Sequence, residues 1–372
     1  MPLASLCFTS GKRSKRFSIV RSLNLRNPYA VLQRAVRETA MQLRAFGRTG
    51  LQLSALGFGC GAVGGLMVRG DAADQERTVA RAIAAGLNYF DTAVQYGNGE
   101  SERNLGRILQ KLKPANVVVG TKVRLQPGDV GRIAEAVTTS LEGSLARLRL
   151  DQVDIFHLHN PITEKGDEQA LDVRQVLHDV VPVFERLRQQ GKVRFLGLTA
   201  IGETGPLHRV IDSGAFESAQ VVYNMLNPSA AQDLPANYPA QDYGRLFDHT
   251  SAAGVGVVDI RVLAGGALSG SAERHPIAGP APEPIGSAAS YDGDIDRARR
   301  LMPLVEEGFA DSLTEAAIRF TLSNPAVSTI LVGMATPQQF DGALAAVEKG
   351  PLAQAAIDRL SALQQAFIGE PR

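Results

Sequence analysis

The sequence has little of several features by which whole classes of protein are recognised. Its 372 residues include only two cysteines, Cys7 and Cys60, which are too few for a disulfide framework and lack the spacing of a zinc site. Basic residues number 39 and acidic residues 38, so no electrostatic footprint favours nucleic acid or an anionic membrane. The uncharged residues 51–68 include five glycines and make a poor membrane-spanning helix. These absences predict a soluble, cytoplasmic protein whose partner is a small molecule.

Acidic residues are almost missing from residues 1–40. This segment has the single acid Glu38 against eight basic residues, namely Lys12, Arg13, Lys15, Arg16, Arg21, Arg26, Arg34 and Arg37. Such a start resembles an organellar transit peptide, which would direct the protein to an organelle, but an unselected leader before a working start at Met41 fits equally well. We expect residues 1–40 to be a basic N-terminal extension, disordered or transit-like, and residues 41–372 to form a single domain.

Beyond Met41, apolar segments rich in β-forming residues alternate with amphipathic helical segments. Two short segments that flank Gly47-Arg48-Thr49-Gly50 predict a β-hairpin. Eight further segments have the character of buried parallel strands: residues 55–60, 87–93, 116–123, 153–160, 193–200, 218–226, 256–263 and 328–334. Eight strand-and-helix units are typical of the (β/α)8 barrel. The predicted fold is therefore α/β, a (β/α)8 TIM barrel with an N-terminal β-hairpin.

The segments between the predicted strands carry apolar residues three or four positions apart, as helices that cover a sheet do. Helices are expected at residues 74–85, 101–111, 130–148, 173–190 and 242–253. Residues 265–294 differ from these segments, because they are rich in Gly, Pro, Ala and Ser and too long for an ordinary connection. We expect this segment to be a loop over the barrel mouth.

Polar side chains follow three of the predicted strands at their carboxyl ends, where the active site of such a barrel lies. The second strand leads through Asp91 into a loop with Tyr96, and the third ends at Lys122. The fourth carries His157 and His159, which the two-residue period of a strand places on one face. Each residue alone has an ordinary structural explanation, such as an ion pair or a packed phenol. Their convergence on consecutive strands favours a functional site.

These residue types together suit proton transfer at a carbonyl group. A phenol with a pKa of about 10 is a weak acid. A nearby ammonium such as Lys122 lowers that pKa, and Asp91 would hold Lys122 charged and in place. His159 can donate a hydrogen bond to a substrate oxygen and orient it toward Tyr96. Because no side chain supplies a hydride, a nicotinamide cofactor is implied for carbonyl reduction or its reverse.

The same residues stand in three motifs that together resemble the aldo-keto reductases: Asp91-x-Ala93-x-x-Tyr96-Gly97, Gly120-Thr121-Lys122 and His157-Leu158-His159. The resemblance extends over about residues 43–352, and it includes the hairpin and residues 191–199. It implies a catalytic tetrad of Asp91, Tyr96, Lys122 and His159, with no metal ion. It also implies that Thr199 and Gln220 hold the nicotinamide carboxamide.

The expected cofactor site departs from the common family pattern after the fifth and seventh strands. Thr199-Ala200 replaces the usual Ser-Asn pair, so one carboxamide contact is missing or supplied elsewhere. Where a tyrosine usually stacks on the nicotinamide, the chain has Ile260-Arg261-Val262-Leu263. Arg261 is a candidate planar substitute, and Leu263 is a further candidate contact.

After the eighth strand, the candidate cofactor contacts are Gly333, Met334, Thr336 and Gln339. Thr336 is the expected N-cap of a helix, with Pro337 at its first position and Gln339 completing a capping box. Such a helix start can bind phosphate. NADP-dependent relatives commonly have Lys and Arg here, whereas residues 329–343 contain no basic residue. The expected cofactor is NAD(H) or NADP(H), with NAD(H) favoured.

The expected activity is NAD(P)-dependent interconversion of an aldehyde, ketone or sugar lactol with the corresponding alcohol or lactone. The variant cofactor site is more similar to the aldose and galactose dehydrogenases than to the aldose reductases. One alternative is a catalytically weak regulatory protein on the same fold, because potassium-channel β subunits also resemble this family. A second is a barrel metallohydrolase that uses His157 and His159, although further ligands are missing. A Rossmann fold built on Gly59-Cys60-Gly61-Ala62-Val63-Gly64 is disfavoured, because no helix follows directly.

Overall fold

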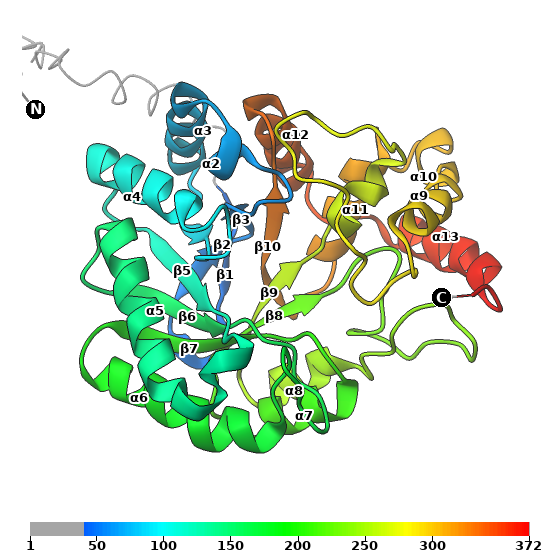
Figure 1. Cartoon of the computed structure of the whole chain (residues 1–372). Coiled ribbons are helices and arrows are strands. Elements are labelled where there is room, and N and C mark those ends of the chain that lie inside the picture. Colours follow the sequence, from blue (N-terminus) through cyan, green and yellow to red (C-terminus); the bar gives the residue numbers. More distant parts are fainter. Residues whose placement is uncertain (1–40, 372) are drawn as a thin grey trace, which may run out of the picture. The chain divides into compact units, whose positions relative to one another are not determined.

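The computed structural model describes residues 41–371, so the expectations for residues 1–40 lie outside the described residues. Eight parallel strands form a closed barrel in the order β10-β3-β4-β5-β6-β7-β8-β9, and helices surround it (Figure 1). This arrangement confirms the predicted (β/α)8 fold. Within the described part of the chain, no helix combines the length and the apolar character needed to cross a membrane.

All eight predicted strands are present. They are β3 (Leu56–Gly59), β4 (Tyr89–Asp91), β5 (Val118–Val123), β6 (Val153–Leu158), β7 (Val193–Thr199), β8 (Ser218–Val222), β9 (Gly256–Ile260) and β10 (Val327–Gly333). Most are shorter than predicted. The strand expected to reach residue 226 ends at Val222, because Asn224 and Asn227 exchange backbone hydrogen bonds of 3.2 and 3.1 Å that turn the chain.

The helices are α2 (Leu66–Arg69), α3 (Ala72–Ala84), α4 (Glu100–Leu112), α5 (Ile133–Leu148), α6 (Val181–Gln189), α7 (Thr204–Asp212), α8 (Leu246–Ala252), α9 (Tyr291–Arg299), α10 (Pro303–Glu306), α11 (Leu313–Leu322), α12 (Pro337–Glu348) and α13 (Gln354–Gln364). All five predicted helices are among them. The one expected from residue 173 begins with the π-helical turn η3 (Gln175–Val180). The one expected from residue 242 begins only at Leu246, because Arg245 has a left-handed φ of 56°.

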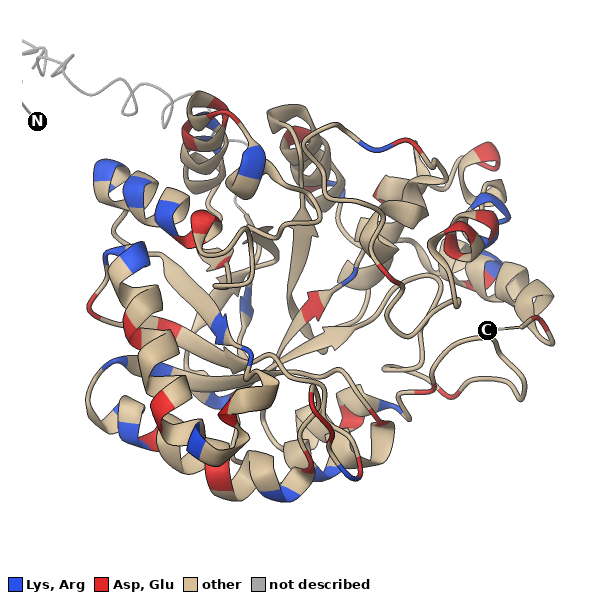
Figure 2. Ribbon diagram, viewed as in Figure 1, with Lys and Arg blue, Asp and Glu red and all other residues tan. Residues whose placement is uncertain are grey.

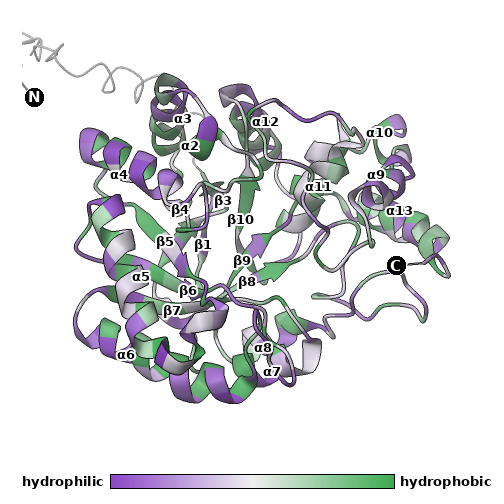
Figure 3. Cartoon of the chain, viewed as in Figure 1, coloured by the Kyte–Doolittle hydropathy of each residue, from purple (hydrophilic) through white to green (hydrophobic). Residues whose placement is uncertain are grey.

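Charge and hydropathy separate across the layers of the barrel. Charged residues gather on the outer helices, and few lie on the strands (Figure 2). Hydrophobic residues line the strands and the helix faces that contact them (Figure 3). Burial of these apolar faces between helices and sheet provides the main stabilisation of such a fold.

The predicted hairpin closes the amino-terminal end of the barrel. Strands β1 (Leu43–Ala45) and β2 (Gln52–Ser54) pair antiparallel around the turn η1 (Gly47–Thr49). Phe46 and Leu53 are fully buried and pack in one cluster with Tyr89 from inside the barrel. A Cβ atom at Gly256, where β9 begins, would lie 2.4 Å from the Phe46 ring, so this close contact requires glycine.

Glycines in the strands make room for two large side chains inside the barrel. A Cβ atom at Gly120 would lie 2.8 Å from the Tyr89 hydroxyl, and one at Gly197 would lie 2.4 Å from the His157 ring. Tyr89 and His157 are both 0% exposed. The interior is therefore a packed core that supports the polar groups above it.

The long segment at residues 265–294 lies beside the barrel mouth, as predicted. It contains the short helical turn η4 (Ala264–Ser269) and then no helix or strand until α9. Arg274 Nη2 and the Gly279 amide both donate to the Val63 carbonyl at 3.1 Å, and Arg69 Nε donates to the Ile277 carbonyl at 2.7 Å. These bonds join the loop that follows β9 to the loop that follows β3, across the end of β10.

Candidate active site

Asp91, the last residue of β4, lies at the centre of a buried polar cluster at the mouth. Lys122 Nζ, from β5, donates hydrogen bonds to Asp91 Oδ1 and, at 2.8 Å, to the Thr92 carbonyl. Asp91 Oδ2 accepts hydrogen bonds from the Tyr89 hydroxyl at 3.0 Å and from Gln220 Nε2 at 2.6 Å. Both oxygens of the carboxylate therefore have partners, as a buried charge requires.

Lys122 is fully buried but keeps its charge. Burial lowers the pKa of Lys122, whereas Asp91 and Tyr96 raise it, and the result lies above the ordinary value. Its Nζ atom is 4.9 Å from the centroid of the Tyr96 ring. The structure thus brings together the carboxylate, the ammonium and the phenol that the sequence predicted as neighbours.

Tyr96 lies in the loop between β4 and α4, and both ends of this loop are anchored. The Ser101 hydroxyl bonds the Thr92 hydroxyl at 2.8 Å and donates to the Cys60 carbonyl at 2.9 Å. The Ser101 amide also donates to the Tyr96 carbonyl at 3.2 Å. The phenol is therefore held at the mouth by buried hydrogen bonds on either side of it.

Lys122 is only one of several groups that set the pKa of Tyr96. Burial raises the pKa of Tyr96, Lys122 lowers it, and Asp91 raises it, so that the pKa lies above its ordinary value. Lys122 therefore acts in the predicted direction, but burial and Asp91 outweigh it. The cost of burying a phenolate exceeds the attraction of an ammonium that Asp91 already neutralises.

His159 and His157 occupy successive layers on the inner face of the barrel, as the strand period predicted. His159 follows β6, and its ring lies edge to face with Tyr96 at a centroid separation of 6.4 Å. Burial and the nearby cations Lys122 and Arg124 lower the pKa of His159 to about 3. A pKa of about 3 means that His159 is neutral at physiological pH. His157 lies deeper, and its Nε2 forms a 3.0 Å hydrogen bond with the Ser218 hydroxyl.

The two histidines are not part of a wider cluster of metal ligands in the region described. Across residues 41–371, no group of three or more His, Cys, Asp or Glu side chains is arranged to hold a metal ion. The Nε2 atom of His157 is engaged by Ser218.

Thr199 and Gln220, the residues expected to hold the nicotinamide carboxamide, belong to the same polar cluster. They are 2% and 1% exposed, and the Thr199 hydroxyl donates to Gln220 Oε1 at 3.1 Å. Gln220 Nε2 in turn donates to Asp91. One N–H of the Gln220 amide and a lone pair of its carbonyl remain for a further partner.

Arg261 and Leu263 follow β9 at the edge of the long loop. Arg261 has a left-handed φ of 60°, a conformation that costs free energy in a residue other than glycine. Asn224 Nδ2 donates to its carbonyl at 2.9 Å, and its guanidinium donates to the Glu283 carbonyl at 3.3 Å. Burial lowers the pKa of Arg261, while Tyr96 and Asp294 oppose that effect. Arg261 is thus a partly buried cation at the mouth.

The end of β10 leads into α12 through Gly333, Met334 and Thr336. The Thr336 hydroxyl accepts a hydrogen bond from the Gln339 amide at 3.2 Å, which confirms Thr336 as the N-cap. The predicted capping box is wrong, because Gln339 Oε1 accepts from the Ala335 amide at 2.7 Å and not from that of Thr336. The Gln339 side chain therefore reaches one residue further back than a capping box requires.

The Gly59-to-Gly64 motif has a structural role between β3 and β10. A Cβ atom at Gly59 would lie 2.9 Å from the Val332 carbonyl oxygen, and one at Gly64 would lie 2.3 Å from the Met334 amide. These glycines allow two backbone segments to approach closely where the barrel closes. The four-residue helix α2 follows, and no Rossmann unit is formed.

The sequence motifs indicate Asp91 and Gln220 but not the contact between them, and they do not include Tyr89. The hydroxyl of Tyr89 is part of the cluster because residues two apart on a strand share a face. That spacing from Asp91 was visible in the sequence. The bond from Gln220 joins residues that are 129 positions apart, and local spacing cannot reveal it.

Comparison with known proteins agrees with this geometry. The sequence profile of the aldo/keto reductase family matches residues 55–365. The chain belongs to the aldo-keto reductase family. It is therefore an oxidoreductase of a family that generally uses nicotinamide cofactors and acts on small carbonyl substrates.

Individual relatives have different names. L-galactose dehydrogenase of Arabidopsis thaliana is 31% identical over 316 residues, which cover 83% of this chain and 89% of the relative. A protein of Schizosaccharomyces pombe named for a voltage-gated potassium channel subunit beta is 28% identical and covers 82% of this chain and 88% of its own. The solved structure of an aldo-keto reductase from Bacillus halodurans, in its holo form, shares the fold with a TM-score of 0.64 and 24% identity. That match covers 89% of this chain and 98% of the other.

Proposed function

We propose that this aldo-keto reductase interconverts an aldehyde, ketone or sugar lactol with the corresponding alcohol or lactone, with Tyr96 as general acid and base. The observation that carries the proposal is the buried Asp91–Lys122 ion pair, whose Nζ atom lies 4.9 Å from the centroid of the Tyr96 ring. An ammonium held beside a phenol stabilises the phenolate that forms when the proton leaves.

Tyr96, Lys122 and Asp91 have distinct roles in this proposal. When bound, a nicotinamide cofactor supplies the hydride for reduction or accepts it in oxidation. In reduction, the carbonyl π bond breaks as hydride bonds to carbon, and the Tyr96 hydroxyl gives its proton to the oxygen. The raised pKa of Tyr96 keeps that proton in place at neutral pH. Lys122 stabilises the resulting phenolate, and Asp91 keeps Lys122 charged and oriented.

His159 positions the substrate oxygen. A neutral imidazole can donate one hydrogen bond to that oxygen without bringing a proton that competes with the proton of Tyr96. The depressed pKa of His159, about 3, supports this role. Its ring and that of Tyr96, with centroids 6.4 Å apart, are close enough for one oxygen to bond both side chains.

The residues at the ends of β7, β8, β9 and β10 fit a nicotinamide cofactor. Thr199 and Gln220 keep polar atoms for a carboxamide, and the partly buried guanidinium of Arg261 offers a planar cation beside Leu263. Around the amino end of α12, the candidate contacts for the other half of the cofactor are Gly333, Met334, Thr336 and Gln339. Backbone N–H groups at a helix start suit a phosphate.

We favour NAD(H) over NADP(H). A 2′-phosphate needs a positively charged partner, and residues 329–343 around the start of α12 contain no Lys or Arg. Comparable or tighter binding of NADPH would contradict this preference.

A sugar lactol or a small aromatic aldehyde is the substrate class that we favour, with oxidation as the direction in the cell. The similarity to L-galactose dehydrogenase, which covers 83% of this chain, supports an aldose-type substrate. The Thr199-Ala200 variant and the lack of basic residues near α12 support the same branch.

Cofactor titration followed by a substrate panel tests the proposal. The sequence has no tryptophan, so NADH and NADPH fluorescence can be followed without interference from indole emission. Turnover is then measured with aldoses, aromatic aldehydes and their alcohols. Tyr96→Phe should remove most turnover and leave NADH affinity unchanged. The matched control is Tyr238→Phe, which loses only a 3.2 Å hydrogen bond to the Leu226 carbonyl.

Two results would overturn the proposal in different ways. Turnover by Tyr96→Phe at the wild-type rate would exclude Tyr96 as the acid and base. Tight NADH binding by the wild type without turnover of any substrate would favour the regulatory alternative instead.

A further inference from the structure

Arg124 follows β5 directly and lies on the face that points to the barrel mouth. In the register of β5 and β6, Lys122 pairs with His157, and the His159 amide donates to the Val123 carbonyl at 2.8 Å. Val123 and Leu125 belong to the outer core between the strands and the helices. By alternation, Arg124 lies between them on the same face as Lys122, one layer higher and beside His159.

The backbone around Arg124 is fixed. Asn160, which is 1% exposed, accepts a hydrogen bond from the Leu125 amide at 2.8 Å and donates to the Leu125 carbonyl at 2.9 Å. The same amide group donates to the Gln169 carbonyl at 3.0 Å. The backbone that carries Arg124 is therefore held at the rim by buried contacts, which lowers the cost of ordering a recognition group there.

The guanidinium of Arg124 has no hydrogen bond or ion pair to any residue between 41 and 371, and its side chain is partly buried. Its positive charge nonetheless acts on the site. Burial and Lys122 have the larger effects, and Arg124 lowers the pKa of His159 further. Arg132, a short way along the same connection, pairs instead with Asp129 at 3.6 Å. Arg124 thus keeps five N–H donors and a positive charge for an external partner.

The topology separates Arg124 from the proposed cofactor contacts. In the closed order of eight strands, β5 stands four positions from β9, which leads to Arg261, and three positions from β10, which leads to α12. Arg124 therefore lies across the mouth from the residues after β9 and β10 that we assign to the cofactor, while Thr199 and Gln220, which we assign to the uncharged carboxamide, lie on β7 and β8, two and three positions away. Because the cofactor phosphates are assigned to the start of α12, an anion beside Arg124 would belong to the substrate.

We propose that Arg124 is a specificity-determining residue that binds a carboxylate on the substrate, so that the enzyme prefers carbonyl compounds and lactols carrying a carboxylate. This inference rests on the proposed function. A planar guanidinium matches a planar carboxylate through two parallel hydrogen bonds. The other cation on this face of β5, Lys122, is neutralised by Asp91, so the single free positive charge of Arg124 suits a monoanion better than a phosphate dianion.

Matched aromatic substrates test the inference. We would measure kcat/KM with NADH for 4-formylbenzoate, its neutral methyl ester and 4-formylphenyl phosphate, using wild type, Arg124→Gln and Arg124→Lys. The ratio of the carboxylate to the ester should fall roughly 10- to 100-fold in Arg124→Gln, mainly through KM, and recover partly in Arg124→Lys. The control Arg132→Gln should keep the ratio within about twofold.

Binding without turnover provides a second readout. Calorimetric titration of 4-(hydroxymethyl)benzoate into the protein with NADH, a pair between which no hydride can pass, should show a comparable loss of affinity in Arg124→Gln, with NADH affinity unchanged. Because this titration does not require turnover, it distinguishes failure of this inference from failure of the proposed function. An unchanged carboxylate-to-ester ratio, weaker NADH binding in Arg124→Gln, or a larger loss on the phosphate ester would each overturn the assignment.

Discussion

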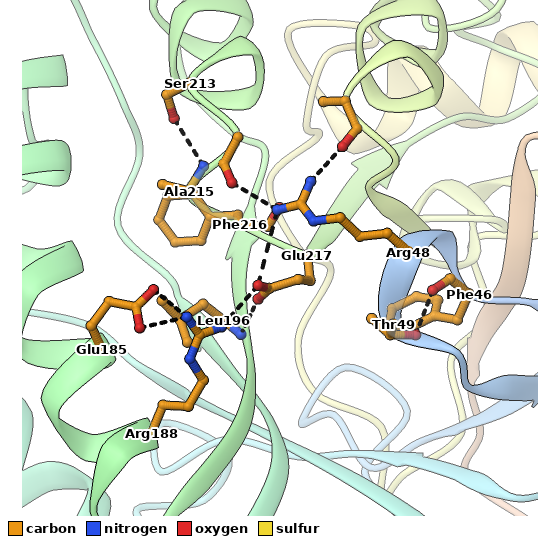
Figure 4. A network of polar contacts seen from close by, with 12 residues as sticks. Phe46, Arg48, Thr49, Glu185, Arg188, Leu196, Ser213, Ala215, Phe216 and Glu217 are labelled. Carbon is orange, nitrogen blue, oxygen red and sulfur yellow. Dashed lines mark hydrogen bonds and ion pairs between the residues drawn. The ribbon is translucent and has the colours of Figure 1, made fainter.

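The two ends of the barrel use charged residues in different ways. At the amino-terminal floor, Arg48 from η1 donates to the carbonyls of Gly214 at 2.7 Å and Phe216 at 2.8 Å, and its guanidinium lies 4.0 Å from Glu217 (Figure 4). Glu217 also accepts a 2.9 Å hydrogen bond from Arg188. Every charged group in this network has a partner within the protein.

At the mouth, several polar groups are buried or constrained without being paired in this way. Arg124 has no partner in the described chain, Arg261 has a left-handed backbone, and the Nδ1 atom of His159 is buried without a hydrogen bond. Tyr96 and His159 have pKa values moved in opposite directions, both because of burial. Groups perturbed in this way concentrate at functional sites. We infer that the floor stabilises the fold and that the mouth keeps its polar groups for ligands.

The largest effect is expected from Lys122→Met, which removes one partner of the buried ion pair at the mouth. Loss of a partner leaves Asp91 buried and unpaired, so the free energy of unfolding should fall by about 3–5 kcal/mol. Because the phenolate also loses its ammonium, kcat should fall roughly 10²- to 10⁴-fold. Urea unfolding and NADH-coupled assays measure the two effects. Lys111→Met, which breaks an exposed pair with Glu76, is the control and should change neither by much.

The pH dependence of the two directions should differ. Oxidation needs the Tyr96 phenolate, and the pKa of Tyr96 lies above its ordinary value, so the oxidation rate should rise about tenfold per pH unit from about pH 6 to 9. Reduction needs the protonated phenol and a neutral His159, whose pKa is about 3, so its rate should stay flat from about pH 5 to 8. Stopped-flow kinetics in both directions provide the test. A reduction rate that falls as the pH is lowered through about 6.5 would show that His159 titrates in the ordinary range, and it would contradict the role of a neutral His159.

A smaller effect is expected from Tyr89→Phe, which keeps the aromatic ring but removes the hydroxyl that donates to Asp91 at 3.0 Å. The pKa of Tyr89 lies well above its ordinary value through burial and Asp91, so the group is a permanent donor. Its loss should lower the free energy of unfolding by about 1–2 kcal/mol and kcat by roughly three- to tenfold. An unchanged kcat, measured beside Tyr238→Phe, would separate Tyr89 from the active site.

The smallest effect, and one on stability alone, is expected at the floor. Arg48→Ala removes hydrogen bonds to the carbonyls of Gly214 and Phe216, but its side chain is 37% exposed, so the loss in the free energy of unfolding should be about 1 kcal/mol. The kcat should match that of the wild type. A large loss of activity in Arg48→Ala would contradict the inference that the floor contributes to stability and not to catalysis.

The features that depend on local periodicity were predictable from the sequence. The eight strands, the hairpin and the Asp91–Lys122 pair follow from apolar alternation and from the rule that strand ends meet at one edge of a parallel barrel. The early end of β8 was not predictable, because residues 223–226 keep a strand-like composition and only the turn at Asn224 ends the strand.

The features that depend on burial or on distant contacts could not be predicted. The pKa of Tyr96 rises because its loop folds against the mouth, and sequence spacing gives no measure of that burial. Gln339 misses its expected capping partner by one residue, a difference set by side-chain geometry. The bond from Gln220 to Asp91 depends on the closure of the whole barrel.

Single-turnover kinetics of Tyr96→Phe tests the central claim most directly. The variant is saturated with NADH and mixed with an aldehyde that the wild type reduces, and the loss of NADH absorbance is followed through one turnover. We predict unchanged NADH affinity and a hydride-transfer rate that is roughly 10²- to 10⁴-fold slower. A single-turnover rate equal to that of the wild type would show that the proton comes from another group and would contradict the assignment of Tyr96.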